Sequence, residues 1–294
     1  MNSFFNFERV MIINHQHFDF NGKVVLERVK YNAPLTTNRN MQDEACLLYN
    51  IMGKFDLYSP IDKETIRSRE CVIMKCGQYF TSAPKSNKRE SSEVIAIHFY
   101  PELIKLAFKE GLPKFLQING NNKRQNAISR ISVDAIINNY IDGLLLLFET
   151  PTLVTEDLII HKVKEIILIL HNTDSEEAEK IKEIISDVFN PNQASFKEII
   201  EAHCYNSITI EQLAYLCNMS ISTFKRRFSE NFGKTPARYI RQKKMNKAAQ
   251  LLRNTNESVA SICYEVGFSD TSNFVKAFTS QFKTTPSKFR KQSQ

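Results

Sequence analysis

The stretch Ile262-Cys-Tyr-Glu-Val-Gly-Phe-Ser269 decides the fold of the last third of this chain, together with Ser272-Asn-Phe-Val-Lys-Ala-Phe278 and Phe282-Lys-Thr-Thr-Pro286, which follow it. About fifty residues earlier, the same pattern occurs as Leu213-Ala-Tyr-Leu-Cys-Asn-Met-Ser220, Ser222-Thr-Phe-Lys-Arg-Arg-Phe228 and Phe232-Gly-Lys-Thr-Pro236. Both copies are typical of a helix, a turn and a second helix. A supersecondary unit that occurs twice in one chain predicts two structural modules of the same kind that act as a pair.

The residues around the two copies predict a series of helices. Thr209, with Gln212 three residues later, forms a capping-box pattern, and Gly233 is placed to end a helix in left-handed geometry. Pro236 favours a new helix start. The expected helices are 195–203, 209–217, 221–230, 236–253, 259–266 and 271–281, with a short helix after residue 286. The fourth helix, of about 18 residues, would span about 27 Å and separate the two units.

Helix 221–230 is the first candidate for a DNA recognition helix. Phe224 and Phe228 are four residues apart, so both are expected to face the core. Ser222, Lys225 and Arg226 stand at positions i, i+3 and i+4 and share another face. Arg and Lys donate hydrogen bonds to guanine, so this outward face suits the edges of bases.

Helix 271–281 repeats this arrangement with different outward residues. Phe274 and Phe278 are expected inside, which leaves Ser272, Asn273 and Lys276 outside. Asparagine pairs with adenine through two hydrogen bonds, and residues near the start of a recognition helix usually reach the bases. For any single one of these residues, a phosphate contact or a solvated side chain stays open as the alternative.

The long helix 236–253 carries a row of cations without the geometry to read bases. The row consists of Arg241, Lys243, Lys244 and Lys247. Phosphate neutralisation and plain solvation are equally consistent with this pattern. If about 6–8 phosphates are neutralised in all, the affinity for DNA should fall steeply with salt.

The net charge is concentrated in the same part of the chain. The 294 residues carry a formal charge of +7, and residues 191–294 hold 16 Lys and Arg against 7 Asp and Glu. Residues 1–190 hold 23 and 25, so all of the positive excess lies in the last third. A basic segment that also folds indicates a domain that binds a polyanion, whereas the alternative is a merely solvated basic surface.

Composition and segment patterns bound the other functions. No apolar run approaches the length that spans a bilayer, and the N-terminus lacks the pattern of a secretory signal. We therefore expect a cytoplasmic protein with no membrane partner. The six cysteines form no CxxC pair and are expected to be reduced and structural, although a redox pair of Cys71 and Cys76 is an alternative.

The first hundred residues predict a β-rich domain. Short apolar or alternating runs occur at 10–13, 24–29, 46–51, 71–74 and 94–99, with turn residues between them. Several short strands at this spacing are typical of a barrel or a sandwich. Helices are expected from Pro101, then at 133–148, 158–171 and 176–189, before a boundary at 190–193. Helices 133–148 and 158–171 carry apolar stripes, which predict that this pair packs on the β domain, forms a dimer interface, or does both.

Residues 195–290 resemble the DNA-binding domain of the AraC/XylS family of bacterial transcription regulators. The most specific part is Val259–Phe278 together with Thr285-Pro-Ser-Lys-Phe-Arg290. The resemblance implies two helix-turn-helix units, joined by a long helix, that enter successive major grooves of double-stranded DNA. By motif position it points to Ser222, Lys225, Arg226, Thr271, Ser272, Asn273 and Lys276, with Arg241 and Lys244 as further DNA contacts.

Three positions depart from the family pattern. The family usually has glycine at Lys283, arginine at Lys244 and alanine at Cys263. The change at Lys283 raises the question of how the last recognition helix ends.

The N-terminal half resembles the cupin-like sensing domains of the same family more weakly. The expected fold is therefore α+β, with a cupin-like β-barrel and appended helices at 1–190 (the helices at about 128–190), then an all-α double helix-turn-helix domain at 191–294. The resemblance implies a transcription activator that works with RNA polymerase. It also implies control by a small-molecule or protein effector, or an N-terminal half that mainly forms a homodimer. No cofactor is expected.

An enzyme is the competing hypothesis, because related barrels carry metal-dependent oxygenases. Such chemistry needs histidines and a carboxylate on one face of the metal. His15, His17 and His98 are the candidates, but no carboxylate follows at the spacing of metal-binding cupins. We therefore expect no metal site and no catalytic residue. Six aromatic residues could line an effector pocket, although a core role is the better expectation: Phe18, Phe20, Tyr49, Phe55, Tyr58 and Phe99.

Overall fold

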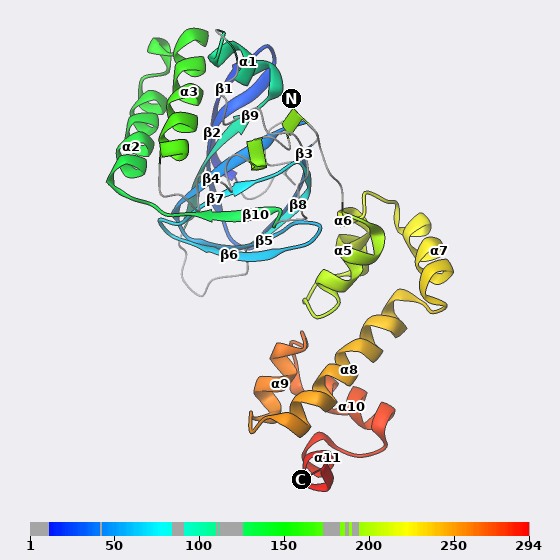
Figure 1. The fold of residues 1–294 in the computed structure, drawn as a ribbon. Helices are drawn as coiled ribbons and strands as arrows, with labels where there is room; N and C mark the ends of the chain where they lie inside the picture. The colour runs from blue at the N-terminus through cyan, green and yellow to red at the C-terminus, as the bar shows by residue number, and fades with distance from the viewer. Residues whose placement is uncertain are drawn as a thin grey trace. The chain divides into compact units, whose positions relative to one another are not determined.

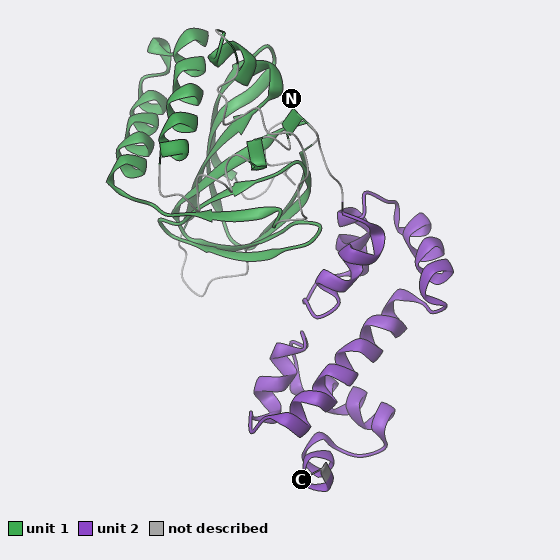
Figure 2. Ribbon diagram, in the orientation of Figure 1, with its two compact units in different colours: residues 1–193 green, residues 194–294 purple. Residues whose placement is uncertain are grey.

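The computed structural model describes residues 12–41, 43–83, 91–109, 111, 126–172, 183–185, 188–189 and 194–293. The chain divides into two compact units, residues 1–193 and 194–294 (Figure 2). No helix within those described ranges is long and apolar enough to cross a membrane.

The described strands of the first unit form two antiparallel sheets. The strands are β1 (Ile12–Phe20), β2 (Lys23–Asn32), β3 (Leu35–Met41), β4 (Ala45–Met52), β5 (Lys54–Tyr58), β6 (Lys63–Arg67), β7 (Cys71–Met74), β8 (Gly77–Ala83), β9 (Ser91–Phe99) and β10 (Ile128–Ile131). One sheet has the order β1-β2-β9-β4-β7-β10, and the other has the order β3-β8-β5-β6.

The larger sheet is covered on both faces. One face and the smaller sheet enclose a core that includes Tyr31, Leu48 and Phe55. The other face packs against the helices of the unit through residues such as Leu47 and Ile97. Because both faces of this sheet are covered, β4 and β9 are buried along nearly their whole length, whereas β3 alternates buried and exposed residues.

The predicted cupin-like barrel needs a correction, because the described strands do not close into one barrel. β2 pairs with β1 and β9, whereas β3, directly after it in sequence, pairs with β8 in the other sheet. Between β2 and β3 the chain passes through Pro34, which has no N–H to continue a ladder. The chain changes sheets at that point, so the fold of this unit is a two-sheet sandwich with appended helices.

The helices of the first unit are α1 (Pro101–Ala107), α2 (Ala135–Glu149), the short 3₁₀ helix η2 (Pro151–Leu153) and α3 (Glu156–Asn172). Figure 1 shows α2 and α3 lying together beside the strands. The Asp134 side chain caps α2 by accepting a hydrogen bond from the N–H of Ile137. The predicted helix 176–189 lies largely outside the described residues, and so do the predicted loop after residue 119 and the boundary 190–193.

The second unit is all-helical in its described part. Its helices are α5 (Phe196–His203), α6 (Ile210–Leu216), α7 (Ile221–Phe232), α8 (Pro236–Asn254), α9 (Val259–Glu265), α10 (Thr271–Phe282) and α11 (Pro286–Ser293). The 19-residue α8 connects the helix pair α6–α7 to the pair α9–α10 (Figure 1).

Candidate nucleic-acid interface

The helix α7 is positioned by a short turn and an aromatic core. Asn218 adopts a left-handed conformation (φ 53°) after α6, and the Ser220 side chain then caps α7 at the N–H of Thr223. Phe224 and Phe228 are fully buried, with their ring centres 5.6 Å and 6.1 Å from that of Phe196 on α5. This packing fixes which face of α7 is left outside.

The three residues predicted on the outward face of α7 are all exposed. Ser222 and Arg226 lie on the side opposite the buried phenylalanines, and Lys225 lies beside them on the flank of the helix. Ile221, which the sequence reasoning missed, precedes them and is 40% exposed. Ile221 stands three residues before Phe224 and so continues its apolar i, i+3, i+7 stripe, which means that the sequence pattern predicts burial and carries no signal of this exposure. An exposed aliphatic side chain there is suited to contact a thymine methyl group.

The helix α10 repeats this local structure with a different cap. Asp270 accepts hydrogen bonds from the N–H groups of Ser272 and Asn273, both at 3.0 Å. Phe274 and Phe278 are fully buried, as in the first copy. Because the two phenylalanines face the core, the residues that were predicted to contact DNA from this helix lie on its accessible side.

The predicted residues of α10 differ in exposure. Ser272, Asn273 and Lys276 are exposed, and Thr271 is half-buried at the start of the helix. Asn273 is the residue whose amide offers both a donor and an acceptor to one base. The two copies therefore have the same core and different outward chemistry.

The question raised by Lys283 has a structural answer. Gly233 ends α7 in left-handed geometry (φ 64°), and Lys283 ends α10 in the same geometry (φ 59°). In both cases the cap N–H bonds back to a carbonyl oxygen four residues earlier, that of Ser229 or Thr279. The lysine thus preserves the helix ending despite the strain that a side chain adds in this conformation.

The basic residues of α8 do not form one group. Arg241 is exposed, whereas Lys247 pairs with Glu265 at 3.3 Å. Lys244 is a correction to the sequence prediction, because it is buried and its ammonium donates to the backbone carbonyls of Asn206 and Gly267. An ammonium bonded inside the protein is not placed to neutralise a phosphate, so Lys244 leaves the set of candidate DNA contacts.

The first unit holds a buried ionic cluster that the sequence reasoning did not find. Glu27 on β2 lies 2.6 Å from His15 Nε2 and 3.5 Å from His98 Nε2. His98 Nδ1 lies 3.3 Å from Glu44, which also accepts a hydrogen bond from Arg39 at 2.6 Å. Glu27 and His98 are 71 positions apart in the sequence. A contact between residues so far apart leaves no pattern in the local sequence.

The electrostatics of this cluster favour a charged imidazole. Burial by itself lowers the pKa of His98, but the neighbouring Cys46, Glu27 and Glu44 outweigh it and hold that pKa well above the usual value. Burial raises the pKa of Glu44, whereas His98 and Arg39 lower it with a net downward result. Within the described residues, no group of three or more His, Cys, Asp or Glu side chains is arranged to hold a metal ion.

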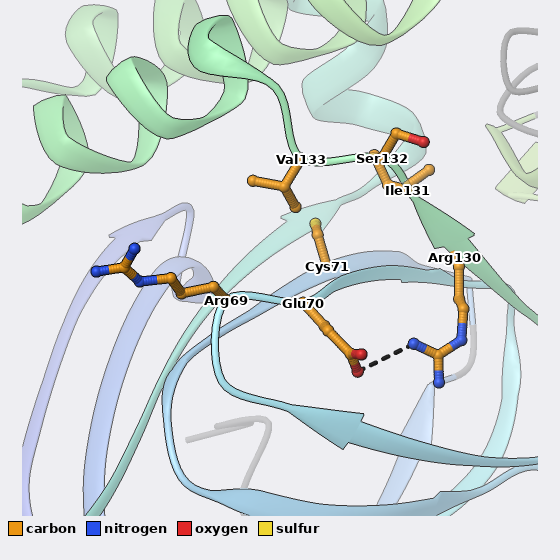
Figure 3. A pocket seen from close by; sticks show the side chains of 7 residues that line it. All are labelled: Arg69, Glu70, Cys71, Arg130, Ile131, Ser132 and Val133. Carbon is orange, nitrogen blue, oxygen red and sulfur yellow. Dashed lines mark hydrogen bonds and ion pairs between the residues drawn. The ribbon is translucent and has the colours of Figure 1, made fainter.

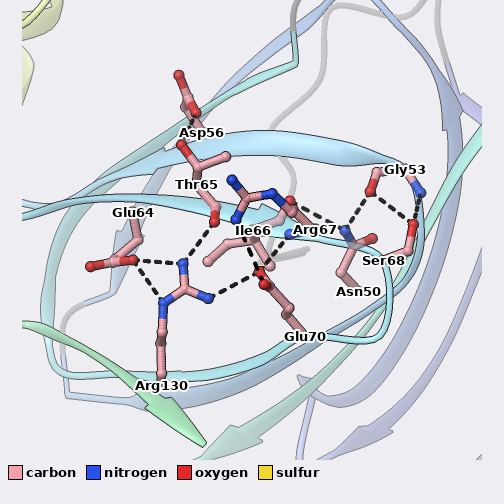
Figure 4. A network of polar contacts seen from close by, with 10 residues as sticks. All are labelled: Asn50, Gly53, Asp56, Glu64, Thr65, Ile66, Arg67, Ser68, Glu70 and Arg130. Atoms are coloured by element: carbon pink, nitrogen blue, oxygen red, sulfur yellow. Dashed lines mark hydrogen bonds and ion pairs between the residues drawn. The ribbon is translucent and has the colours of Figure 1, made fainter.

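A surface pocket of about 410 Å³ lies where β7 begins and β10 ends (Figure 3). It is lined by Arg69, Glu70, Cys71, Arg130, Ile131, Ser132 and Val133. Arg130 is already committed, because it donates to the carboxylates of Glu64 and Glu70 and to the carbonyl of Thr65 at 2.8–3.0 Å (Figure 4). This network ties β10 to β6 and to the turn that precedes β7.

The six aromatic residues considered for an effector pocket lie in different cores. Phe20, Tyr49 and Phe99 belong to the core beneath the helices, where Phe18 stacks on Phe148. Phe55 lies between the two sheets, and Tyr58 stacks on Phe80 at 4.2 Å. They therefore do not line one cavity.

Two family models match the chain. The model described as "Helix-turn-helix domain" matches residues 213–292, from within α6 to within α11, and so includes α7, α8, α9 and α10. The model described as "ExsA N-terminal regulatory domain" matches residues 45–179, from β4 to beyond α3.

Individual relatives match a shorter part. An uncharacterised HTH-type transcriptional regulator of Haemophilus influenzae is 37% identical over 86 residues, which is 29% of this chain and 29% of that protein. The HTH-type transcriptional activator RhaS of an Enterobacter species is 34% identical over 91 residues, which is 31% of this chain and 33% of that protein. The matches thus span about a third of the length of these relatives. A crystal structure of ToxT from Vibrio cholerae with bound unsaturated fatty acid aligns with 90% of this chain and 95% of its own, at 12% identity and a TM-score of 0.37.

Proposed function

We propose, from the premise that the chain belongs to the AraC/XylS family of DNA-binding transcription regulators, that α7 and α10 are the recognition helices of two helix-turn-helix units. Each monomer would then read two different half-sequences of one asymmetric DNA site. The observation that carries the proposal is the pair of helices with matching buried phenylalanines and different exposed residues.

The reading residues follow from exposure and chemistry. In α7 we assign base contacts to Ser222, Lys225 and Arg226, and Ile221 adds an apolar contact beside them. In α10 we assign them to Thr271, Ser272, Asn273 and Lys276, with Asn273 directed to adenine. A guanine-directed arginine in one helix and an adenine-directed asparagine in the other would give the two halves different preferences.

The helix α8 sets the separation of these two contacts. Its 19 residues correspond to roughly 28 Å of α-helix. Successive major grooves on one face of DNA recur about every 34–36 Å, so a rod of this length suits two neighbouring grooves. Arg241 and the exposed Arg238 would contact phosphates and contribute affinity without base preference.

The first unit would regulate this DNA binding. The match to a regulatory domain over residues 45–179 supports a control function for the unit. We propose activation of transcription together with RNA polymerase, since relatives include proteins named as activators. We expect it to act in the cytoplasm, where the chromosomal DNA of a bacterium lies.

The controlling signal is either a small molecule or a protein partner. We take a small effector as the first candidate, and the pocket beside Arg69 is the first place at which its binding would be sought. The alternative is a first unit that only dimerises or binds a protein. A ligand that binds only the folded state raises the melting temperature, so thermal stabilisation by a panel of metabolites separates the two.

Selection of DNA from a randomised double-stranded library tests the proposal directly. The full-length protein should enrich an asymmetric site with two different half-sequences about one helical turn apart. Enrichment of a single short half-sequence, or of none, would contradict a reader with two recognition helices.

A further inference from the structure

Lys244 is bonded inside the second unit by three neighbours. Its ammonium donates to the carbonyl oxygens of Asn206, at 3.2 Å, and Gly267, at 2.8 Å. It also lies 5.6 Å from the ring centre of Phe268. The residue is only 9% exposed, and burial lowers the pKa of its ammonium.

Three separate segments meet at this ammonium. Asn206 lies in the loop after α5, and α5 packs its Phe196 ring against α7 of the first helix-turn-helix copy. Gly267 forms the turn between α9 and α10 in the second copy. Lys244 itself belongs to α8, which joins the copies. One side chain therefore binds the two copies to each other as well as to their connecting helix.

Two further contacts join the same segments. The hydroxyl of Ser207 donates to the carbonyl oxygen of Gly267 at 3.3 Å. Lys247, three residues after Lys244, pairs with Glu265 on α9 and lies 4.7 Å from the ring centre of Tyr205. The loop 204–207 is thus held against α8 and the second copy at several points.

A comparison of the two turns explains why position 267 is glycine. Asn218 and Gly267 occupy the same left-handed place, and their N–H groups bond to the carbonyls of Tyr215 and Tyr264 at 2.8 Å and 3.0 Å. Asparagine tolerates this conformation, so backbone geometry alone does not require glycine. At Gly267, however, an added Cβ would lie 2.0 Å from the carbonyl oxygen of Tyr205. The glycine permits the close approach of the loop.

We propose that Lys244, Asn206 and Gly267 form a clamp that fixes the two helix-turn-helix copies relative to each other, so that one chain accepts its two half-sequences at a single spacing. This inference rests on the proposed function of α7 and α10 as DNA readers. Lys244 acts here as a positioning residue and contacts no base. Without the clamp, α8 and the more exposed contacts of Ser207 and Lys247 would be left to hold the copies together.

The distance between α7 and α10 in the DNA-free, full-length protein tests the clamp without any assumption about DNA. Spin labels are attached at Ser229→Cys and Ser280→Cys, which are exposed positions. Cys76→Ser removes the native cysteine that is not buried and could also be labelled, whereas the other five cysteines are buried. Lys244→Met should at least double the width of the distance distribution, whereas Lys244→Arg, which keeps a donor, should leave it narrow.

The two turns supply a matched control for this measurement. Gly267→Ala should broaden the distribution, because its methyl group displaces Tyr205, whereas Asn218→Ala adds the same left-handed alanine without that clash. Circular dichroism confirms that each variant retains its helices. Unchanged widths in folded Lys244→Met and Gly267→Ala would overturn the clamp.

Binding to spaced DNA sites then connects the clamp to function. One inserted base pair between the selected half-sequences shifts them by about 3.4 Å and by about a tenth of a turn. The wild-type protein should lose at least about tenfold in affinity, and Lys244→Met less than about threefold, for the same insertion. Equal losses would contradict the clamp, whereas failure of the wild type to bind any two-part site would instead contradict the proposed function.

Discussion

His98 is fully buried in the first unit between the carboxylates of Glu27 and Glu44. Its pKa in the folded protein is raised well above the value near 6.5 that an unfolded chain has. A raised pKa means that the folded state binds the proton more tightly, so the stabilisation is complete below about pH 6.5 and is lost as the pH rises through the folded value.

The prediction at the residue scale is therefore a pH-dependent stability. Between about pH 6.5 and 8.5, the urea midpoint of the first unit, followed by circular dichroism of its sheets, should fall as the pH rises. His98→Gln should remove this dependence, whereas the exposed His161→Gln should retain it. A midpoint that is constant with pH in the wild type would contradict a protonated His98.

Residues were predictable where their partners lie nearby in sequence. The buried phenylalanines Phe224 and Phe274 and the cap at Thr209 follow from spacings of three and four residues. The inward position of Lys244 was not predictable, because its carbonyl partners at 206 and 267 approach it only in the folded chain. The cluster around His98 stayed hidden for the same reason.

At the scale of elements, we propose that α8 both connects the two helix pairs and contacts the DNA backbone. Arg241 is exposed and has no base-reading position, which fits a phosphate contact. Removal of one phosphate contact reduces the slope of log affinity against log salt by about 0.9. Arg241→Ala should show this reduction and weaken all sequences alike.

The matched control for Arg241 lies three residues further on the same helix. The ammonium of Lys244 already donates to two carbonyls, so Lys244→Met should keep the wild-type salt slope whatever it does to affinity. Binding curves at several salt concentrations, on one DNA site, provide both slopes. If Arg241→Ala kept the wild-type salt slope, Arg241 would not contact a phosphate. If Lys244→Met reduced the slope, Lys244 would contact a phosphate after all.

The strands show where sequence patterns end. The predicted apolar runs fall within β2, β4, β7 and β9, because strand segments that are covered on both faces of a sheet are mostly hydrophobic. β3, with the sequence LTTNRNM, and β6, with KETIR, are half-exposed and too polar to be recognised this way. The pairing of β3 with β8 rather than β2, which separates a sandwich from a closed barrel, depends on contacts distant in sequence.

At the scale of the whole molecule, a second copy of the chain is the partner we propose for α2. Ile136 and Leu146 on α2 and Leu153 in η2 are 57%, 63% and 67% exposed. Ile136 and Leu146 lie within one side of the helix, since ten residues rotate the position by about 280°, or 80° in the opposite sense. Apolar residues grouped on an exposed helix indicate an association surface.

Dimerisation through this surface should be sensitive to charge. Leu146→Glu should shift the full-length protein from dimer to monomer in sedimentation experiments, because the carboxylate would be buried without a partner. Met52→Glu, an exposed apolar position on β4, serves as the control and should leave the dimer intact. A wild-type protein that sediments as a monomer at all concentrations would refute this interface.

The measurement that tests two-part reading most directly is the base preference of Arg226→Ala and Asn273→Ala, each profiled by selection from the same randomised DNA library as the wild type. Arg226 is exposed on α7 and Asn273 on α10, so each substitution should relax preference in a different half of the site, at a loss of about 1–3 kcal/mol. If both variants instead weaken binding to all sequences equally, or both relax the same half, then α7 and α10 do not read separate half-sequences.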